Sequence, residues 1–246
     1  MRTLILADLH ANWPALEAVL ADAEGGYERI VCCGDLVGYN PDPVRVVEWT
    51  KMHCNTVIRG NHDKVVAGTE GLEWFNEVAQ AAALWTKATL EQNHIEYLNS
   101  LPPGPITLED FEIWHGSPRD EDEYITTVRE AIPCFPLMSS PVALFGHTHL
   151  QGGFFSRYRR VGLIPAVARK DRELVIELDS ESLIMVNPGS VGQPRDNDPR
   201  AAYAIFDSAQ RIVVLRRVKY PVEKTVAAIN RAGLPDVLGY RLLSGV

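Results

Sequence analysis

Residues 2–10, RTLILADLH, decide the fold of this chain, because they join an apolar run to two polar side chains that can bind a ligand. The uninterrupted apolar character of residues 3–7 is typical of a strand buried on both faces, which we place at residues 2–7. Residues 14–23 follow with apolar side chains at helical spacing, so the two segments predict a βα unit. Asp8 and His10 then lie at the carboxyl end of the predicted strand.

The same alternation of short apolar runs and helical periods continues along the chain. Strands are predicted at residues 30–33 and 56–58, and helices at residues 44–52, 74–91 and 95–98. After the breaker at residues 102–105, short runs predict strands at residues 106–108, 111–114, 142–145, 153–155, 174–178, 183–186, 203–206 and 212–217, before a helix at residues 222–232. This order predicts an α/β fold, and the absence of a long linker predicts a single domain over residues 1–246.

The charge balance bears on the partners of the protein. The chain has 24 Lys and Arg against 32 Asp and Glu, a formal net charge of −8, so we expect neither long nucleic acid nor a membrane as a partner. The first apolar run ends at Asp8, too short for a signal peptide or a bilayer span, which predicts a cytoplasmic protein. A homo-oligomer is compatible with the sequence, which does not specify the oligomeric state.

Asp, Asn and His side chains recur at the carboxyl ends of the predicted strands. They are Asp8, His10, Asp35, Asn61, His62, Asp63, His115, His147 and His149. This edge is where open α/β sheets bind ligands, so we expect these side chains to meet in one crevice. Mixed carboxylate and imidazole ligands suit Mn, Fe, Zn, Co or Ni, whereas Mg and Ca favour oxygen ligands alone.

Five ordered segments resemble the motif of the calcineurin-like metallophosphoesterases. They are D-x-H at Asp8 and His10, G-D at Asp35, G-N-H-D at Asn61 to Asp63, H-G at His115, and G-H-x-H at His147 and His149. Residues 187–195, NPGSVGQPR, are similar to the small bacterial and archaeal phosphodiesterase-like branch. The resemblance implies a four-layer αββα sandwich of two mixed β-sheets flanked by helices, and a metal-dependent phosphoesterase.

The resemblance also implies a division of roles. Two divalent ions would be held, one by Asp8, His10 and His149 and the other by Asn61, His115 and His147, with Asp35 bridging them. A hydroxide bound to both ions would attack a small phosphodiester or phosphomonoester, and we favour the diester. His62 would give a proton or hydrogen bond to the leaving oxygen, and Asp63 would orient His62. The alternative for Asp63 is to cap the N-terminus of a helix, and both roles are compatible with each other.

Four further residues are candidates for contact with the substrate. Arg59 precedes the G-N-H-D segment, as an arginine does in the protein-phosphatase branch of the family, where it grips phosphate; a surface charge is the alternative. Asn12, Ser190 and Arg195 could line the crevice, although we favour a turn or loop hydrogen bond for each. The basic stretch at residues 157–172 either covers the crevice or forms a solvated hairpin, and we favour the hairpin.

Several other functions are compatible with the same scaffold. A protein phosphatase is disfavoured because residues 34–39, GDLVGY, lack the Asp-Arg-Gly run of that branch. A non-catalytic interaction scaffold is disfavoured because His62 and all seven implied ligands are present. A nucleotide or dinucleoside polyphosphate hydrolase stays open, and a nuclease is opposed by the acidic balance.

Overall fold

In the computed structural model, which describes residues 1–158 and 160–246, the chain forms two six-stranded sheets. The first sheet has the order β3-β2-β1-β11-β12-β9. Its strands are β1 (Arg2–Leu6), β2 (Arg29–Cys32), β3 (Thr56–Val57), β9 (Glu173–Glu177), β11 (Ala201–Asp207) and β12 (Ile212–Val218). β1, β2 and β3 are parallel, whereas β11 pairs antiparallel with both β1 and β12, so the sheet is mixed.

The second sheet is also mixed and has the order β4-β5-β6-β10-β7-β8. Its strands are β4 (Ile106–Thr107), β5 (Glu112–Trp114), β6 (Val142–Phe145), β7 (Gly152–Arg157), β8 (Arg160–Ile164) and β10 (Ser182–Asn187). β5, β6 and β10 run parallel to one another, so β5 and β6 end at the same edge of this sheet.

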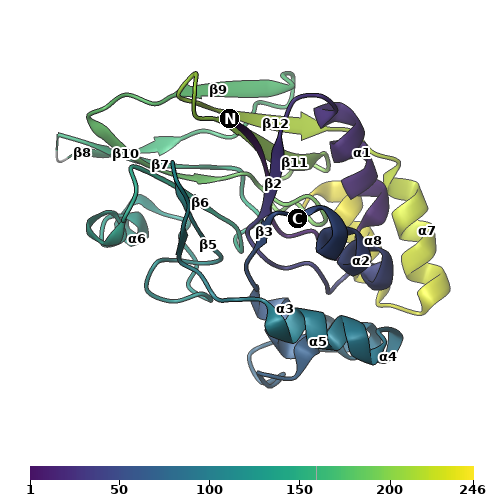
Figure 1. Ribbon diagram of the computed structural model, residues 1–246. Helices are drawn as coiled ribbons and strands as arrows, with labels where there is room; N and C mark the ends of the chain where they lie inside the picture. The colour runs from purple at the N-terminus through teal and green to yellow at the C-terminus, as the bar shows by residue number, and fades with distance from the viewer. Residues whose placement is uncertain (159) are drawn as a thin grey trace.

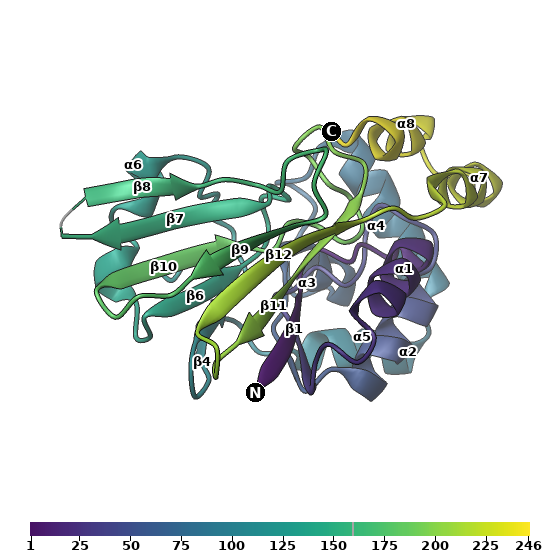
Figure 2. The ribbon, with the colours of Figure 1, turned by 90° about the horizontal axis from the view of Figure 1, so that it is seen from above.

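Helices cover the outer faces of the two sheets, as Figure 2 shows. The helices are α1 (Trp13–Ala23), α2 (Pro43–His53), α3 (Asn61–Ala67), α4 (Glu77–Thr89), α5 (Gln92–Ser100), α6 (Val128–Ala131), α7 (Val222–Ala232) and α8 (Asp236–Ser244), with a 3₁₀ turn at Phe135–Leu137. Figure 1 shows α3, α4 and α5 grouped together beyond the end of β3, and the short α6 beside the second sheet. Within the described ranges, no helix has the length and apolar character needed to cross a membrane.

The alternation of side chains along β1 explains the layers. Leu4 and Leu6 pack with Leu16 of α1 in the core between the first sheet and its helices. Ile5 belongs to the core between the two sheets, together with Leu144 of β6. Because successive strand residues face opposite sides, one apolar run supplies both cores. The predicted four-layer αββα sandwich is therefore confirmed.

The predicted strands are present, with ends shifted by one or two residues. The helix predicted at residues 74–91 is wrong at its start, because the Asn76 side chain accepts a hydrogen bond from the Ala79 N–H (3.0 Å) and caps α4 at Glu77. Trp74 and Phe75 consequently lie in the turn before the helix. The helices α3, α6 and α8 and the strand β8 were not predicted.

The contact between the sheets can be tested at one aromatic pair. The rings of Phe111, immediately before β5, and Phe206 of β11 lie 5.0 Å apart between centroids in an edge-to-face arrangement. Replacing either by Ala is expected to lower the free energy of unfolding by about 3–5 kcal/mol. The double variant should reveal a coupling of about 0.5–1.5 kcal/mol in denaturant unfolding. Phe145 is the control, because it lies in the core on the other face of the second sheet. The losses of stability in Phe145→Ala and Phe111→Ala should therefore be additive in the double variant. Additive losses for Phe111 and Phe206 would contradict the contact.

Candidate metal centre

The loops that follow β1 and β2 are joined by backbone hydrogen bonds. The N–H of Asp8 donates to the carbonyl of Gly34 (3.0 Å), and the N–H of His10 donates to that of Asp35 (3.0 Å). These bonds continue the pairing of the two parallel strands past their ends. As a result, the segments that carry Asp8, His10 and Asp35 are held side by side.

Five of the implied ligands have a left-handed backbone, which is rare for residues other than glycine. The φ angles are 53° at Asp8, 43° at His10, 54° at Asp35, 67° at His147 and 59° at His149. Conformations of this kind cost on the order of 1–3 kcal/mol each and cluster at functional sites. The strain therefore marks this cluster as a site independently of the side chains.

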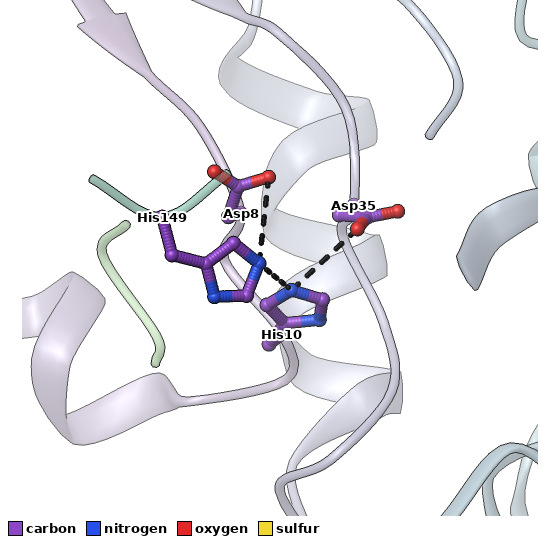
Figure 3. A group of neighbouring side chains, drawn as sticks. All are labelled: Asp8, His10, Asp35 and His149. Atoms are coloured by element: carbon purple, nitrogen blue, oxygen red, sulfur yellow. Dashed lines mark hydrogen bonds and ion pairs between the residues drawn. The ribbon is translucent and has the colours of Figure 1, made fainter. Parts of the chain in front are cut away.

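A first group of metal-binding side chains consists of Asp8, His10, Asp35 and His149, all buried. Figure 3 shows these four side chains pointing toward one another. The Nε2 atoms of His10 and His149 are 3.0 Å apart, and Nε2 of His10 is 3.5 Å from Oδ2 of Asp35. Nε2 of His149 lies 4.0 Å from Oδ1 of Asp8.

A second group consists of Asp35, His115 and His147. Oδ2 of Asp35 lies 3.5 Å from Nε2 of His115, the same distance that separates it from His10 in the first group. Oδ1 of Asn61 is 3.2 Å from Nε2 of His115, which places this amide with the second group. The structure thus gathers the two ligand sets that the sequence resemblance implies, with Asp35 common to both.

Backbone carbonyls fix the orientation of three imidazoles. Nδ1 of His10 donates to the carbonyl of Val37 (2.9 Å), Nδ1 of His115 donates to that of Cys33 (2.8 Å), and Nδ1 of His149 donates to that of Gln193 (2.6 Å); a carbonyl can only accept. In a neutral ring this leaves the lone pair of Nε2 free to bind a metal. Orientation of this kind is typical of histidines that hold metal ions.

The burial of the cluster favours a bound cation. Burial lowers the pKa of His10 to about 4 and that of His147 to about 3, so both rings are neutral at neutral pH. Burial also raises the pKa of Asp8 to about 7, and its Oδ2 has no hydrogen-bond partner among the described residues. A divalent ion would stabilise the ionised carboxylate and use the neutral imidazoles as ligands, so the donor set fits such an ion.

His62 lies beside this cluster, packed between aromatic rings. Its ring centroid is 4.4 Å from that of Tyr39 and 4.5 Å from that of Phe75. Its Nδ1 has no hydrogen-bond partner in the described part of the chain, and a Cβ added to Gly38 would lie 2.4 Å from it. The imidazole also lines a cavity that reaches Asp35 and His149, so it lies where a substrate could contact it.

The expected orientation of His62 by Asp63 is not what the structure shows. Oδ1 of Asp63 accepts from the N–H groups of Leu36 (2.9 Å) and Val37 (3.3 Å), and Oδ2 accepts from Gly60 (2.9 Å). The carboxylate therefore caps α3 and ties it to the loop after β2. This is the alternative considered for Asp63 in the sequence.

Of the four candidates for substrate contact, only Arg195 lines the cavity. Its guanidinium donates to the hydroxyl of Tyr39 (3.0 Å) and to Oε1 of Gln193 (3.3 Å). Arg59 instead forms two hydrogen bonds with the carboxylate of Glu121 (2.8 and 3.0 Å), which holds its guanidinium away from the cavity. The expectation of a phosphate contact is therefore corrected for Arg59.

Asn12 and Ser190 are buried and have structural hydrogen bonds, which is the role favoured for them. The Asn12 side chain caps α1, accepting from the N–H of Ala15 (3.3 Å), and donates to the carbonyl of Gly192 (2.9 Å). The Ser190 hydroxyl donates to the carbonyl of Asp8 (2.8 Å). Both residues thus hold the first ligand loop and do not line the cavity.

The basic stretch at residues 157–172 begins at the last residue of β7 and contains β8, which pairs with β7 as a hairpin. None of its described residues lines the cavity. Arg157 pairs with Asp179 (3.5 Å), and Arg172 pairs with Asp22 (2.5 Å). The favoured reading as a hairpin is therefore consistent with the structure.

The cavity beside the cluster has a volume of about 590 Å³. Four aromatic residues that the sequence did not assign to the site line it, namely Tyr39, Trp74, Phe75 and Tyr124, and Arg241 contributes a further cation. Of these rings, Tyr39 could have been assigned to the site from the sequence, because it follows Asp35 within the same motif segment. Trp74 and Phe75 were not considered as site residues, because the sequence placed them inside a helix.

Comparison with known proteins places this architecture in a family. The calcineurin-like phosphoesterase superfamily domain matches residues 1–211. An uncharacterised protein of Methanocaldococcus jannaschii is 33% identical over 253 residues, which cover 98% of this chain and 97% of that protein. The crystal structure of a metallophosphoesterase from Sphaerobacter thermophilus has a TM-score of 0.88 and 40% identity, covering 100% of this chain and 99% of that one.

A hypothetical protein from Pyrococcus horikoshii shares the fold, with a TM-score of 0.76 at 21% identity over 100% of this chain and 98% of that one. The matched domain and the relative at 33% identity both extend across the residues that form the metal centre. On this sequence evidence, together with two mixed sheets that present clustered Asp and His side chains at their strand ends, the chain belongs to the calcineurin-like phosphoesterase superfamily.

Proposed function

We propose that this protein is a metal-dependent phosphoesterase with two divalent ions, and that a small phosphodiester is its preferred substrate. The observation that carries the proposal is the position of Asp35. Its Oδ2 lies 3.5 Å from an imidazole nitrogen of each ligand group, and Asp35 lines the cavity. One carboxylate oxygen between two sets of imidazole nitrogen donors suits a pair of ions that share a ligand.

The side chains around the cavity have distinct proposed roles. Asp8, His10 and His149 would hold one ion, Asn61, His115 and His147 the other, and Asp35 both. Bound ions would supply an activated water as nucleophile and neutralise charge on the phosphoryl oxygens. His62 would donate a proton to the leaving oxygen, and Arg195 would bind a phosphoryl oxygen, since both line the cavity.

The proposed reaction predicts a strict need for metal. Bis(p-nitrophenyl) phosphate and p-nitrophenyl phosphate should both be tested, with a higher kcat/KM expected for the diester. Chelation should abolish nitrophenolate release, and Mn²⁺, Co²⁺ or Ni²⁺ should restore it. Undiminished turnover in protein shown by elemental analysis to be free of metal would exclude the mechanism.

The shared position of Asp35 predicts unequal losses of metal. Asp35→Ala removes a ligand from both groups and should abolish tight binding of both ions, whereas Asp8→Ala should weaken mainly one. Elemental analysis of metal per chain measures the difference, and circular dichroism verifies the fold. Asp120→Asn is the control, because Asp120 lines the cavity without belonging to either group, and it should keep the wild-type content. Two ions retained in Asp35→Ala would refute the shared ligand.

A role for His62 as general acid predicts a loss of turnover without loss of metal. His62→Ala and His62→Gln should lower kcat by roughly 10²–10⁴ on an alkyl ester, whose leaving oxygen needs a proton. The loss should be smaller on a nitrophenyl ester, because nitrophenolate leaves without protonation. His53→Ala, at an exposed position on α2, is the control. Equal losses on both esters would instead assign His62 to binding phosphate.

A further inference from the structure

The cavity extends well beyond the metal-binding side chains. A volume of about 590 Å³ lies within the range of sites that hold a whole organic ligand, roughly 300–1,000 Å³. Asp35, His147 and His149 line it, and so do Trp74 and Tyr124. A substrate bound through its phosphate at the centre therefore has room for a sizeable organic group along the aromatic wall.

Trp74 is unusually exposed for its size. The residue has 86% of its surface accessible, the highest value among the exposed large hydrophobic residues of the described chain, although it lines the cavity. The adjacent Phe75 is anchored, since its ring packs on His62 and its carbonyl accepts a hydrogen bond from the Gln80 side chain (2.8 Å). The same Gln80 amide donates to the carbonyl of Leu72 (3.2 Å). The turn that presents Trp74 is thus fixed on both sides of the indole.

A second ring, Tyr124, comes from the loop after β5. Its centroid lies 4.1 Å from that of His147, and 49% of the residue is exposed. Buried Lys64 connects this loop to the turn of Trp74, because its Nζ binds both Asp122 (2.6 Å) and Glu70 (2.9 Å). The Tyr124 ring thus packs on His147, and the backbone that presents Trp74 is fixed before any ligand binds, which lowers the entropic cost of ordering these segments around a planar group.

We infer that the aromatic wall is a subsite for a nucleobase, so that the preferred substrate is an ester of a nucleoside phosphate. This inference rests on the proposed function, because it assigns the organic part of the same substrate. Every base presents a flat face that stacks on an indole or phenol ring. The cations of Arg195 and Arg241 line the same cavity, and they suit the phosphate and the polar edge of a base.

A matched pair of ligands isolates the base. Adenosine 5′-monophosphate and ribose 5-phosphate share the sugar and the phosphate, and only the first has a base. Calorimetric titration of the metal-loaded His62→Gln variant, in which turnover is too slow to obscure binding, should give a Kd that is roughly 5- to 100-fold lower for adenosine 5′-monophosphate. Adenosine 5′-monophosphate should also inhibit the hydrolysis of bis(p-nitrophenyl) phosphate by the metal-loaded enzyme more strongly than ribose 5-phosphate does.

Variants of Trp74 decide whether the wall provides this preference. Trp74→Ala should remove most of the difference between the two ligands and leave the affinity for ribose 5-phosphate unchanged. Trp74→Phe keeps a ring for stacking and should retain much of the difference. Tyr158→Ala is the control, because Tyr158 is 71% exposed in the turn after β7 and does not line the cavity.

The two proposals can fail separately. Equal affinities in the wild type, or a preference that survives Trp74→Ala, would overturn the nucleobase subsite even if the nitrophenyl diester is cleaved. A base preference that Trp74→Ala removes would support the subsite even if no ester is cleaved, in which case the proposed hydrolysis would fall.

Discussion

The backbone pairing between the loops after β1 and β2 is the constraint on which the site depends. The parallel register of the two strands continues through the bonds from Asp8 to Gly34 and from His10 to Asp35. The loop after β3 is joined to these two through the carboxylate of Asp35, since its Oδ1 accepts from the N–H of His62 (2.9 Å). The second sheet is attached at this point as well, because the N–H of His147 donates to Oδ1 of Asp8 (2.9 Å). The ligand carboxylates therefore hold the loops together as well as facing the centre.

Most of the fold could be predicted because its signals are local. An apolar run such as residues 2–7 identifies a buried strand without knowledge of its neighbours, and Gly, Pro and polar residues mark where strands end. The start of α4 was missed because Trp74 and Phe75 continue the apolar period of the helix, although Asn76 is a typical capping residue. The helix α3 was missed because its first turn consists of the motif residues, which carry no apolar period.

The ligands were predictable for a different reason, since strand ends at one edge of a sheet bring distant residues together. The role of Arg59 was not predictable, because its partner Glu121 lies 62 residues away and nothing near Arg59 in the sequence indicates that pairing. The cap formed by Asp63 was among the alternatives open in the sequence, because a carboxylate at the third position of a helix commonly bonds the backbone at its start. The aromatic wall could not have been assembled, since its rings come from loops whose positions depend on ion pairs such as that of Lys64.

The placement of Trp74 has a consequence for how such proteins diverge. The metal-binding side chains are carried on loops that are bonded to the strands and to one another, so most changes there disturb the whole centre. The turn between α3 and α4, by contrast, lies away from both sheets (Figure 1) and is anchored to α4 through Gln80. Replacement of the exposed Trp74 in this turn would change the wall of the cavity without removing a described contact of a metal-binding side chain. Under the proposed function, a change at this one position would alter the choice of substrate and leave the metal centre as it is.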